Sequence, residues 1–230
     1  MRIRPVVLLV LALVAILGSA LPVEAAGTPL SVLVNRGRTD KPWVALTFDD
    51  GWTLDACTKI ANILRAEHAT GTFLVTGGHI ASAPKQWKEA LAGFPVANHS
   101  FSHPDFTTIR PIKVRWQIAH NEAVIGAALD RPMVKVLRPP FGAQNRTVLR
   151  IAGRLGYTRT VTWTMSAADT SAYSTVSTVY RNSVGGGPGA IVLMHCGPPE
   201  TIAALPAIIR SYKARGFRLV GLGQILGVAK

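Results

Sequence analysis

Residues 43–51 read WVALTFDDG, a mostly apolar run that ends in two adjacent carboxylates and a glycine. A short run that is apolar on both faces is typical of a parallel strand covered by helices. Adjacent carboxylates such as Asp49 and Asp50 repel each other near a core unless a cation or a shared proton compensates. The stretch predicts a buried strand with a polar site at its carboxyl end, although a solvated Asp-Asp-Gly turn would read the same way.

Further short apolar runs follow this strand and alternate with longer amphipathic stretches. We predict strands at 43–48, 72–76, 94–97, 134–137, 158–164, 190–194 and 217–220, and helices at 54–67, 84–91, 111–129, 146–155, 175–184 and 199–215. Strands separated by helices predict a parallel α/β fold, either a doubly wound sheet or an irregular barrel. We expect an irregular lead-in over 26–41 and a single domain over 42–230.

The N-terminus has the pattern of an export signal. Arg2 and Arg4 precede an uncharged apolar run over residues 5–21, and Val23-Glu24-Ala25 fits a small-x-small cleavage site. We therefore predict a signal peptide over 1–25 and a secreted, extracellular or wall-associated protein. The alternative is an uncleaved membrane anchor, for which the apolar run is short, because a full span needs roughly 20 residues.

The chain is strongly basic, with a formal net charge of +13. Removal of Arg2, Arg4 and Glu24 with the signal peptide would lower this charge to +12. Such a surface attracts polyanions. Export argues against nucleic acid and favours anionic cell-wall polymers or acidic glycans, while a surface adapted only for solubility is the plainer alternative.

The chain has two cysteines, Cys57 and Cys196. An exported protein is in an oxidising setting, where a disulfide can form. Both residues lie just beyond polar motifs that we place at the same end of the sheet, so we predict that they pair.

The unusual polar residues all follow the carboxyl ends of predicted strands. Besides the two aspartates, they are His99, His103, Arg138, Asp169 and His195. In parallel α/β folds this rim is where sites are built. We therefore expect these residues to form one site.

The residue types suggest a metal centre with an acid and a base. Histidines four apart, His99 and His103, would share a face of a helical turn. Together with one carboxylate they suit zinc or another divalent transition metal, although a pair of surface histidines is the simpler interpretation. We interpret the other histidines, His68, His79 and His120, as structural or surface residues.

These motifs, in this order, resemble those of the NodB-homology polysaccharide deacetylases, carbohydrate esterase family 4. The resemblance runs from about Trp43 to Val220 and rests on TFDDG at 47–51, HSFSH at 99–103, RPPFG at 138–142, Asp169 and LMH at 193–195. It implies a distorted (β/α)7-type barrel and a metal-dependent hydrolase that removes acetyl groups from a polysaccharide such as peptidoglycan or chitin.

The resemblance also implies roles for individual residues. Asp50, His99 and His103 would bind the metal, with Zn²⁺ the default. Asp49 would be the catalytic base, held by Arg138.

His195 would be the general acid, and Asp169 would adjust the pKa of its imidazole. The Phe141 backbone N–H would stabilise the oxyanion, although the family usually has tyrosine there. Leu193 would line the acetyl pocket.

The fourth motif departs from the family pattern Trp-x-x-Asp-x-x-Asp-Trp. Residues 163–170 read WTMSAADT, with Ser166 in place of the first aspartate and Thr170 in place of the last tryptophan. That tryptophan normally shapes the sugar groove, so the departure weakens any inference about the glycan. A non-catalytic glycan-binding module and an amidase acting on cyclic imides remain alternatives, as does O-acetyl rather than N-acetyl specificity.

Overall fold

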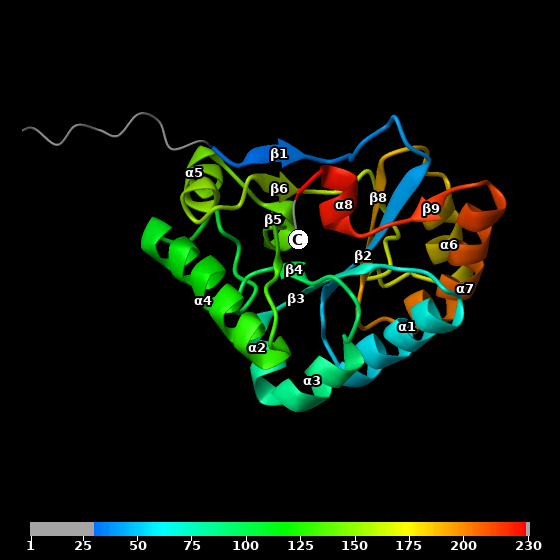
Figure 1. The fold of residues 1–230 in the computed structure, drawn as a ribbon, viewed down its shortest axis with the longest axis horizontal. Helices are drawn as coiled ribbons and strands as arrows, with labels where there is room; N and C mark the ends of the chain where they lie inside the picture. Colours follow the sequence, from blue (N-terminus) through cyan, green and yellow to red (C-terminus); the bar gives the residue numbers. More distant parts are fainter. Residues whose placement is uncertain (1–29, 229–230) are drawn as a thin grey trace, which may run out of the picture.

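The computed structural model describes residues 30–228, which form parallel strands surrounded by helices (Figure 1). The strands are β1 (Val32–Val34), β2 (Trp43–Asp50), β3 (Thr72–Val75), β4 (Ala97–Asn98), β5 (Val134–Leu137), β6 (Arg159–Val161), β7 (Met165–Ser166), β8 (Ala190–His195) and β9 (Arg218–Leu219). The helices are α1 (Leu54–Ala66), α2 (Gly77–Ser82), α3 (Pro84–Ala90), α4 (Pro111–Leu129), the 3-10 turn η1 (Pro140–Gly142), α5 (Arg146–Arg154), α6 (Val176–Val184), α7 (Pro199–Ala214) and α8 (Leu222–Leu226). The predicted signal peptide lies outside the described residues. Within them, no helix combines the length and apolar character that a membrane crossing needs.

The strands are arranged in two parallel arrays. One has the order β1-β6-β5-β4, and the other β3-β2-β8-β7 with β9 also on β2. A bridge between Phe73 and Val96 links the arrays on one side. On the other side the chain passes directly from β6 into β7, and Thr164 donates to the Ile191 carbonyl. The prediction of a distorted parallel barrel is therefore confirmed, and the doubly wound alternative is wrong.

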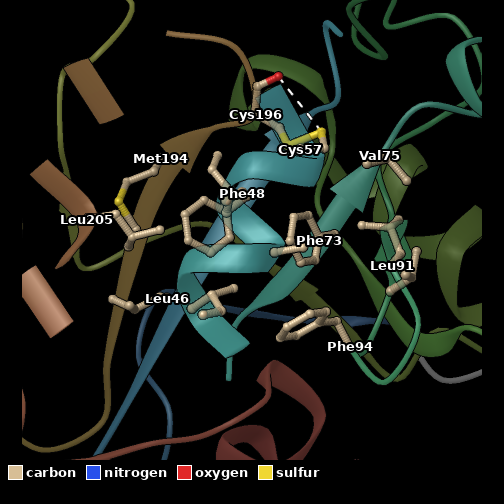
Figure 2. Close-up of a cluster of buried hydrophobic side chains, with 14 of the residues drawn as sticks. Leu46, Phe48, Cys57, Phe73, Val75, Leu91, Phe94, Met194, Cys196 and Leu205 are labelled. Carbon is tan, nitrogen blue, oxygen red and sulfur yellow. Dashed lines mark hydrogen bonds between the residues drawn. A yellow bond between two sulfur atoms is a disulfide. The ribbon is translucent and has the colours of Figure 1, made fainter. Parts of the chain in front are cut away.

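Along β2 the side chains alternate between the hydrophobic core and the interior of the barrel, where the site lies. Leu46 and Phe48 pack in the main apolar cluster beneath α1 (Figure 2). Because successive strand residues point to opposite faces, Thr47 and Asp49 lie on the barrel's inner side. The strand thus buries its outer face against helices and aims a carboxylate inward at its end.

The amino-terminal end of the barrel is closed by α8. Its apolar residues Leu222 and Ile225 cluster with inward-facing strand residues such as Ala45. The Leu222 N–H donates to Thr72 Oγ1, at the first residue of β3 (2.8 Å). Apolar side chains therefore fill the barrel at this end, and the pocket that holds the two aspartates of β2 lies at the carboxyl-terminal rim.

Several elements differ from the sequence prediction. The expected irregular lead-in over 26–41 contains β1, which pairs with β6. The strand predicted at 158–164 is shorter, because β6 ends at Val161 where the chain crosses to the other array, and β7 at Met165–Ser166 lies beyond the predicted bounds. The short helices α2 and α8 were not anticipated, because segments of five or six residues carry too little periodicity to indicate a helix.

The structure joins Cys57 on α1 and Cys196 after β8 in a disulfide, with their Cα atoms 5.1 Å apart (Figure 2). The bond links positions separated by 139 residues. It therefore ties the first helix to the last strand of the site.

Replacing both cysteines by alanine is expected to lower the free energy of unfolding by about 2–4 kcal/mol, because the unfolded chain loses a long covalent loop. Urea denaturation of the unreduced proteins measures the difference. Equal stability of the two proteins, or two titratable thiols in the unreduced wild type, would contradict this expectation.

Candidate metal centre and active site

Most of the polar residues predicted from sequence line one pocket of about 670 Å³ at the carboxyl-terminal rim, and Arg138 and Asp169 support it from behind. Residues lining it include Asp49, Asp50, His99, His103 and His195. They come from the ends of β2 and β8 and from the loop after β4. The expectation that these distant segments share one rim agrees with the structure.

Three ligand atoms converge within this pocket. The Nε2 atoms of His99 and His103 each lie 3.1 Å from Asp50 Oδ1. One ligand atom from each of the three residues lies within 4.8 Å of the other two. Asp50 Oδ1 is buried and lacks a hydrogen-bond partner in the described part of the chain. A carboxylate oxygen and two imidazole nitrogens aimed at one point fit a divalent metal ion with open positions.

The second ring nitrogen of His99 fixes its orientation. Nδ1 lies 2.8 Å from the Arg138 carbonyl oxygen, and a carbonyl can only accept. The proton therefore sits on Nδ1, leaving the Nε2 lone pair free for a metal. Such an outer hydrogen bond is usual for metal-binding histidines.

The loop carrying the histidines is not the helical turn that their spacing suggested. Ser100 and His103 have positive φ values of 74° and 60°. Gln117 on α4 accepts hydrogen bonds from the backbone N–H groups of Phe101 and Ser102, each 2.9 Å. The histidines therefore converge through a strained loop braced by α4, not through helical periodicity.

The electrostatics of the site favour a bound cation. Burial alone would raise the pKa of Asp50, but the close approach of the His103 and His99 imidazoles holds it well below its usual range. Burial lowers the pKa of His99, yet the negative charges of Asp49 and Asp50 outweigh it and raise that pKa. The carboxylates of Asp49 and Asp50 are thus buried close together, and a positive charge beside them is stabilising.

Arg138 holds Asp49 in a buried ion pair. Its Nη1 donates to Asp49 Oδ1 (2.7 Å) and to Thr47 Oγ1 (2.9 Å), and its Nη2 donates to the Thr162 carbonyl (3.0 Å). Arg138 and Asp49 are 1% and 2% exposed. Because Arg138 engages one carboxylate oxygen, Asp49 Oδ2 is the oxygen left for chemistry.

Asp169 holds His195 in a similar way. Its Oδ1 lies 2.8 Å from His195 Nδ1, and its Oδ2 accepts from the His195 N–H (2.7 Å) and Thr201 Oγ1 (2.6 Å). With Nδ1 on the carboxylate, Nε2 is the nitrogen that His195 can offer to a ligand. The site therefore has a second oriented pair, the His195 imidazole held by the Asp169 carboxylate, separate from the pair of Arg138 and Asp49.

The remaining predicted residues also line the pocket. Phe141 has φ of 60°, an exposed ring and an edge contact with His103 at 4.6 Å between ring centroids. Leu193 is nearly buried on the inner face of β8. Of the departures in the fourth motif, Thr170 lies in the pocket lining and Ser166 does not.

Sequence reasoning missed several residues of the site. Trp52 donates from Nε1 to Asp50 Oδ2 (2.8 Å). Thr201 supports Asp169, and His79, predicted to be structural or at the surface, lines the pocket edge and contacts Thr76 Oγ1 (2.9 Å). Only Trp52 carried a signal, its position directly after the Asp-Asp-Gly sequence.

The sequence profile of the polysaccharide deacetylase family matches residues 36–160, more than half of the chain. The chain belongs to this family. A chitooligosaccharide deacetylase from Rhizobium leguminosarum bv. trifolii is 33% identical, with 79% of this chain and 90% of the relative covered. The peptidoglycan-N-acetylmuramic acid deacetylase PdaA of Bacillus subtilis is 28% identical, with 87% and 80% covered.

Solved structures of family 4 carbohydrate esterases share the fold. A peptidoglycan N-acetylglucosamine deacetylase bound to a benzamide compound superposes with a TM-score of 0.81 at 28% identity, covering 87% of this chain and 95% of that one. A pseudoenzyme of the family from Bacillus anthracis gives a TM-score of 0.78 at 25% identity, covering 85% and 69%. The solved structures that resemble this chain thus include both a deacetylase and a pseudoenzyme.

Proposed function

We propose that this member of the polysaccharide deacetylase family is an exported, metal-dependent enzyme that removes N-acetyl groups from a cell-wall glycan, with peptidoglycan the leading substrate and Zn²⁺ the metal. The observation that carries the proposal is the presence in one pocket of a three-residue metal set, a carboxylate held by Arg138 and a histidine held by Asp169. A site built only to bind sugar has no need of all three.

The metal set and the base lie side by side. Asp50, His99 and His103 would hold the cation, which when bound supplies Lewis-acid polarisation of the acetyl carbonyl and of the attacking water. Asp49 then takes the water's proton on Oδ2, since Oδ1 is engaged by Arg138. The Arg138 contact fixes the direction of the base.

His195 completes the reaction as general acid. Its Nδ1 stays on Asp169 while Nε2 delivers a proton to the leaving nitrogen, so that amide and water become acetate and a free amine. The backbone N–H of Phe141, in a left-handed turn beside His103, would donate to the oxyanion.

The wall glycan is favoured by charge and by the predicted export signal. The net charge of +13 would draw the enzyme to anionic wall polymers. The relatives named as chitooligosaccharide and peptidoglycan deacetylases support an N-acetylated glycan.

The test is acetate release by zinc-loaded protein from peptidoglycan, N-acetylglucosamine oligomers and acetylated xylan. Release from the first two, abolished by a chelator and restored by Zn²⁺, is the expected result. Release from xylan alone would assign an O-acetyl esterase, and no release from any substrate would overturn the proposal.

A glycan-binding module without catalysis is the second candidate, because the Bacillus anthracis pseudoenzyme shares the fold. It predicts binding of the same oligomers with no acetate formed. Binding measured beside acetate release separates the two candidates.

The pH dependence of the rate should report His195. Burial lowers its pKa, but the hydrogen bond to Asp169 and the negative charges of Asp49, Asp169 and Asp50 outweigh burial and raise it above 6.5. The acid form is needed, so activity is lost as pH rises through this raised pKa.

Asp169→Asn removes the charge and should move the alkaline limb of the pH–rate profile to lower pH. The exposed Asp130→Asn serves as the matched control and should leave the limb in place. An unmoved limb in Asp169→Asn would show that His195 is not the group observed.

A further inference from the structure

Of the three proposed metal ligands, Asp50, His99 and His103, Trp52 hydrogen-bonds to Asp50 alone, and it is not itself a ligand. Its indole Nε1–H donates to Asp50 Oδ2 (2.8 Å), while Asp50 Oδ1 faces His99 and His103. The two carboxylate oxygens are thereby divided between an indole donor and the metal position. A donor of this kind fixes the direction of a ligand and tunes its affinity.

The same indole also packs against His195, the proposed general acid. Its ring stacks with the His195 ring, with centroids 6.0 Å apart and planes inclined by 27°. The Trp52 backbone N–H donates to the Cys196 carbonyl (3.0 Å), next to the disulfide with Cys57. Trp52 therefore links the end of β2 to the end of β8.

Glycine at position 197 makes room for this ring. A Cβ atom there would lie 2.3 Å from Trp52 Cε3, far inside contact distance. The indole consequently packs directly against the backbone at Gly197, two residues after His195. The position of the indole is therefore fixed by local packing.

Trp52 is nevertheless 47% exposed, and it lines the pocket with Thr170 and Leu193. A large flat ring, open to solvent beside catalytic groups, is the usual partner of an apolar ligand face. A hexose offers such a face through its ring C–H groups. The exposed part of the indole therefore borders the same pocket as the proposed catalytic groups.

We propose that Trp52 is a specificity-determining and positioning residue: its indole N–H fixes Asp50 for the metal, and its exposed face forms a wall on which a sugar ring of the glycan stacks. The inference rests on the proposed function for the identity of the ligand. It gives one side chain two roles: positioning a metal ligand and contacting the sugar.

Two substitutions separate these roles. Trp52→Phe keeps an aromatic ring but loses the N–H donor, so Zn²⁺ affinity should fall by about tenfold with little change in oligosaccharide binding. Trp52→Leu loses both, so affinity for a glucosamine tetramer, the deacetylated product, should also fall by roughly three- to tenfold. Zinc affinity is measured by chelator competition and oligosaccharide affinity by calorimetry, on full-length protein whose folding is checked by circular dichroism.

The matched control is Trp116→Leu. Trp116 on α4 is 46% exposed, close to the exposure of Trp52, but it is not among the pocket-lining residues. Neither affinity should change in this variant. Gly197→Ala tests the packing without altering Trp52, and by displacing the indole it should weaken both affinities.

Wild-type zinc affinity in Trp52→Phe would overturn the positioning role. An unchanged tetramer affinity in Trp52→Leu, or a wild type that binds no tetramer, would overturn the sugar wall. Neither readout requires turnover, so an inactive wild type that shows both shifts would contradict only the proposed deacetylase activity.

Discussion

Asp49→Asn is expected to lower kcat by roughly 10³-fold while leaving Zn²⁺ affinity near that of the wild type. Asparagine has the same shape and can still accept the Arg138 hydrogen bond, but it cannot take a proton from water. Asp49 is not one of the three converging ligand residues, so the metal should remain. Steady-state acetate release and zinc titration on the same preparation measure both quantities.

Asp55→Asn is the control for this variant, because Asp55 is exposed on α1 and pairs with Lys59. Its turnover should equal that of the wild type. If Asp49→Asn kept full activity, Asp49 could not be the base.

His99→Ala should have the other large effect, the loss of the metal together with activity. His99 is buried, and its Nε2 is one of three ligand atoms, so a two-ligand remnant should bind Zn²⁺ more than about 100-fold more weakly. Because metal bound only to the folded state stabilises it, Zn²⁺ should raise the Tm of the wild type but not of the variant.

His79→Ala provides the matched comparison, since His79 lines the same pocket outside the metal set. It should keep wild-type zinc affinity and the Tm response. Equal zinc affinity in His99→Ala and the wild type would remove His99 from the metal centre.

The parts of the fold that follow simple periodicity could be predicted from the sequence. The helix at Pro111–Leu129 and the strand at Val134–Leu137 have the predicted bounds. Alternation along β2 and β8 explains why Asp49 and His195 both point into the barrel. Strand ends in a parallel fold share a rim, so the site's location followed from topology.

The geometry of the ligands could not be predicted in this way. Asp50, Ser100, His103, Phe141 and Ala168 all have positive φ and lie in or beside the site. Non-glycine residues rarely adopt this conformation, which costs about 1–2 kcal/mol each. Such strain is imposed by tertiary contacts, for example from Gln117 to the histidine loop, and no local pattern encodes it.

Trp52 shows a second limit of sequence reasoning. Its contacts reach Asp50 two residues earlier and His195 at the end of the neighbouring strand β8. The position of a tryptophan directly after Asp-Asp-Gly places it near the site, but the sequence does not indicate which residues it contacts. Its role depends on Gly197, which leaves the space that the indole fills.

The most direct test of the account is anomalous X-ray diffraction from crystals of the protein grown with Zn²⁺. A zinc centre at this rim should give one strong peak between Asp50 Oδ1, His99 Nε2 and His103 Nε2, at about 2.0–2.2 Å from each ligand atom. A crystal with no peak there, or with zinc bound at other residues, would contradict a metal centre at this rim and the catalytic assignment built on it.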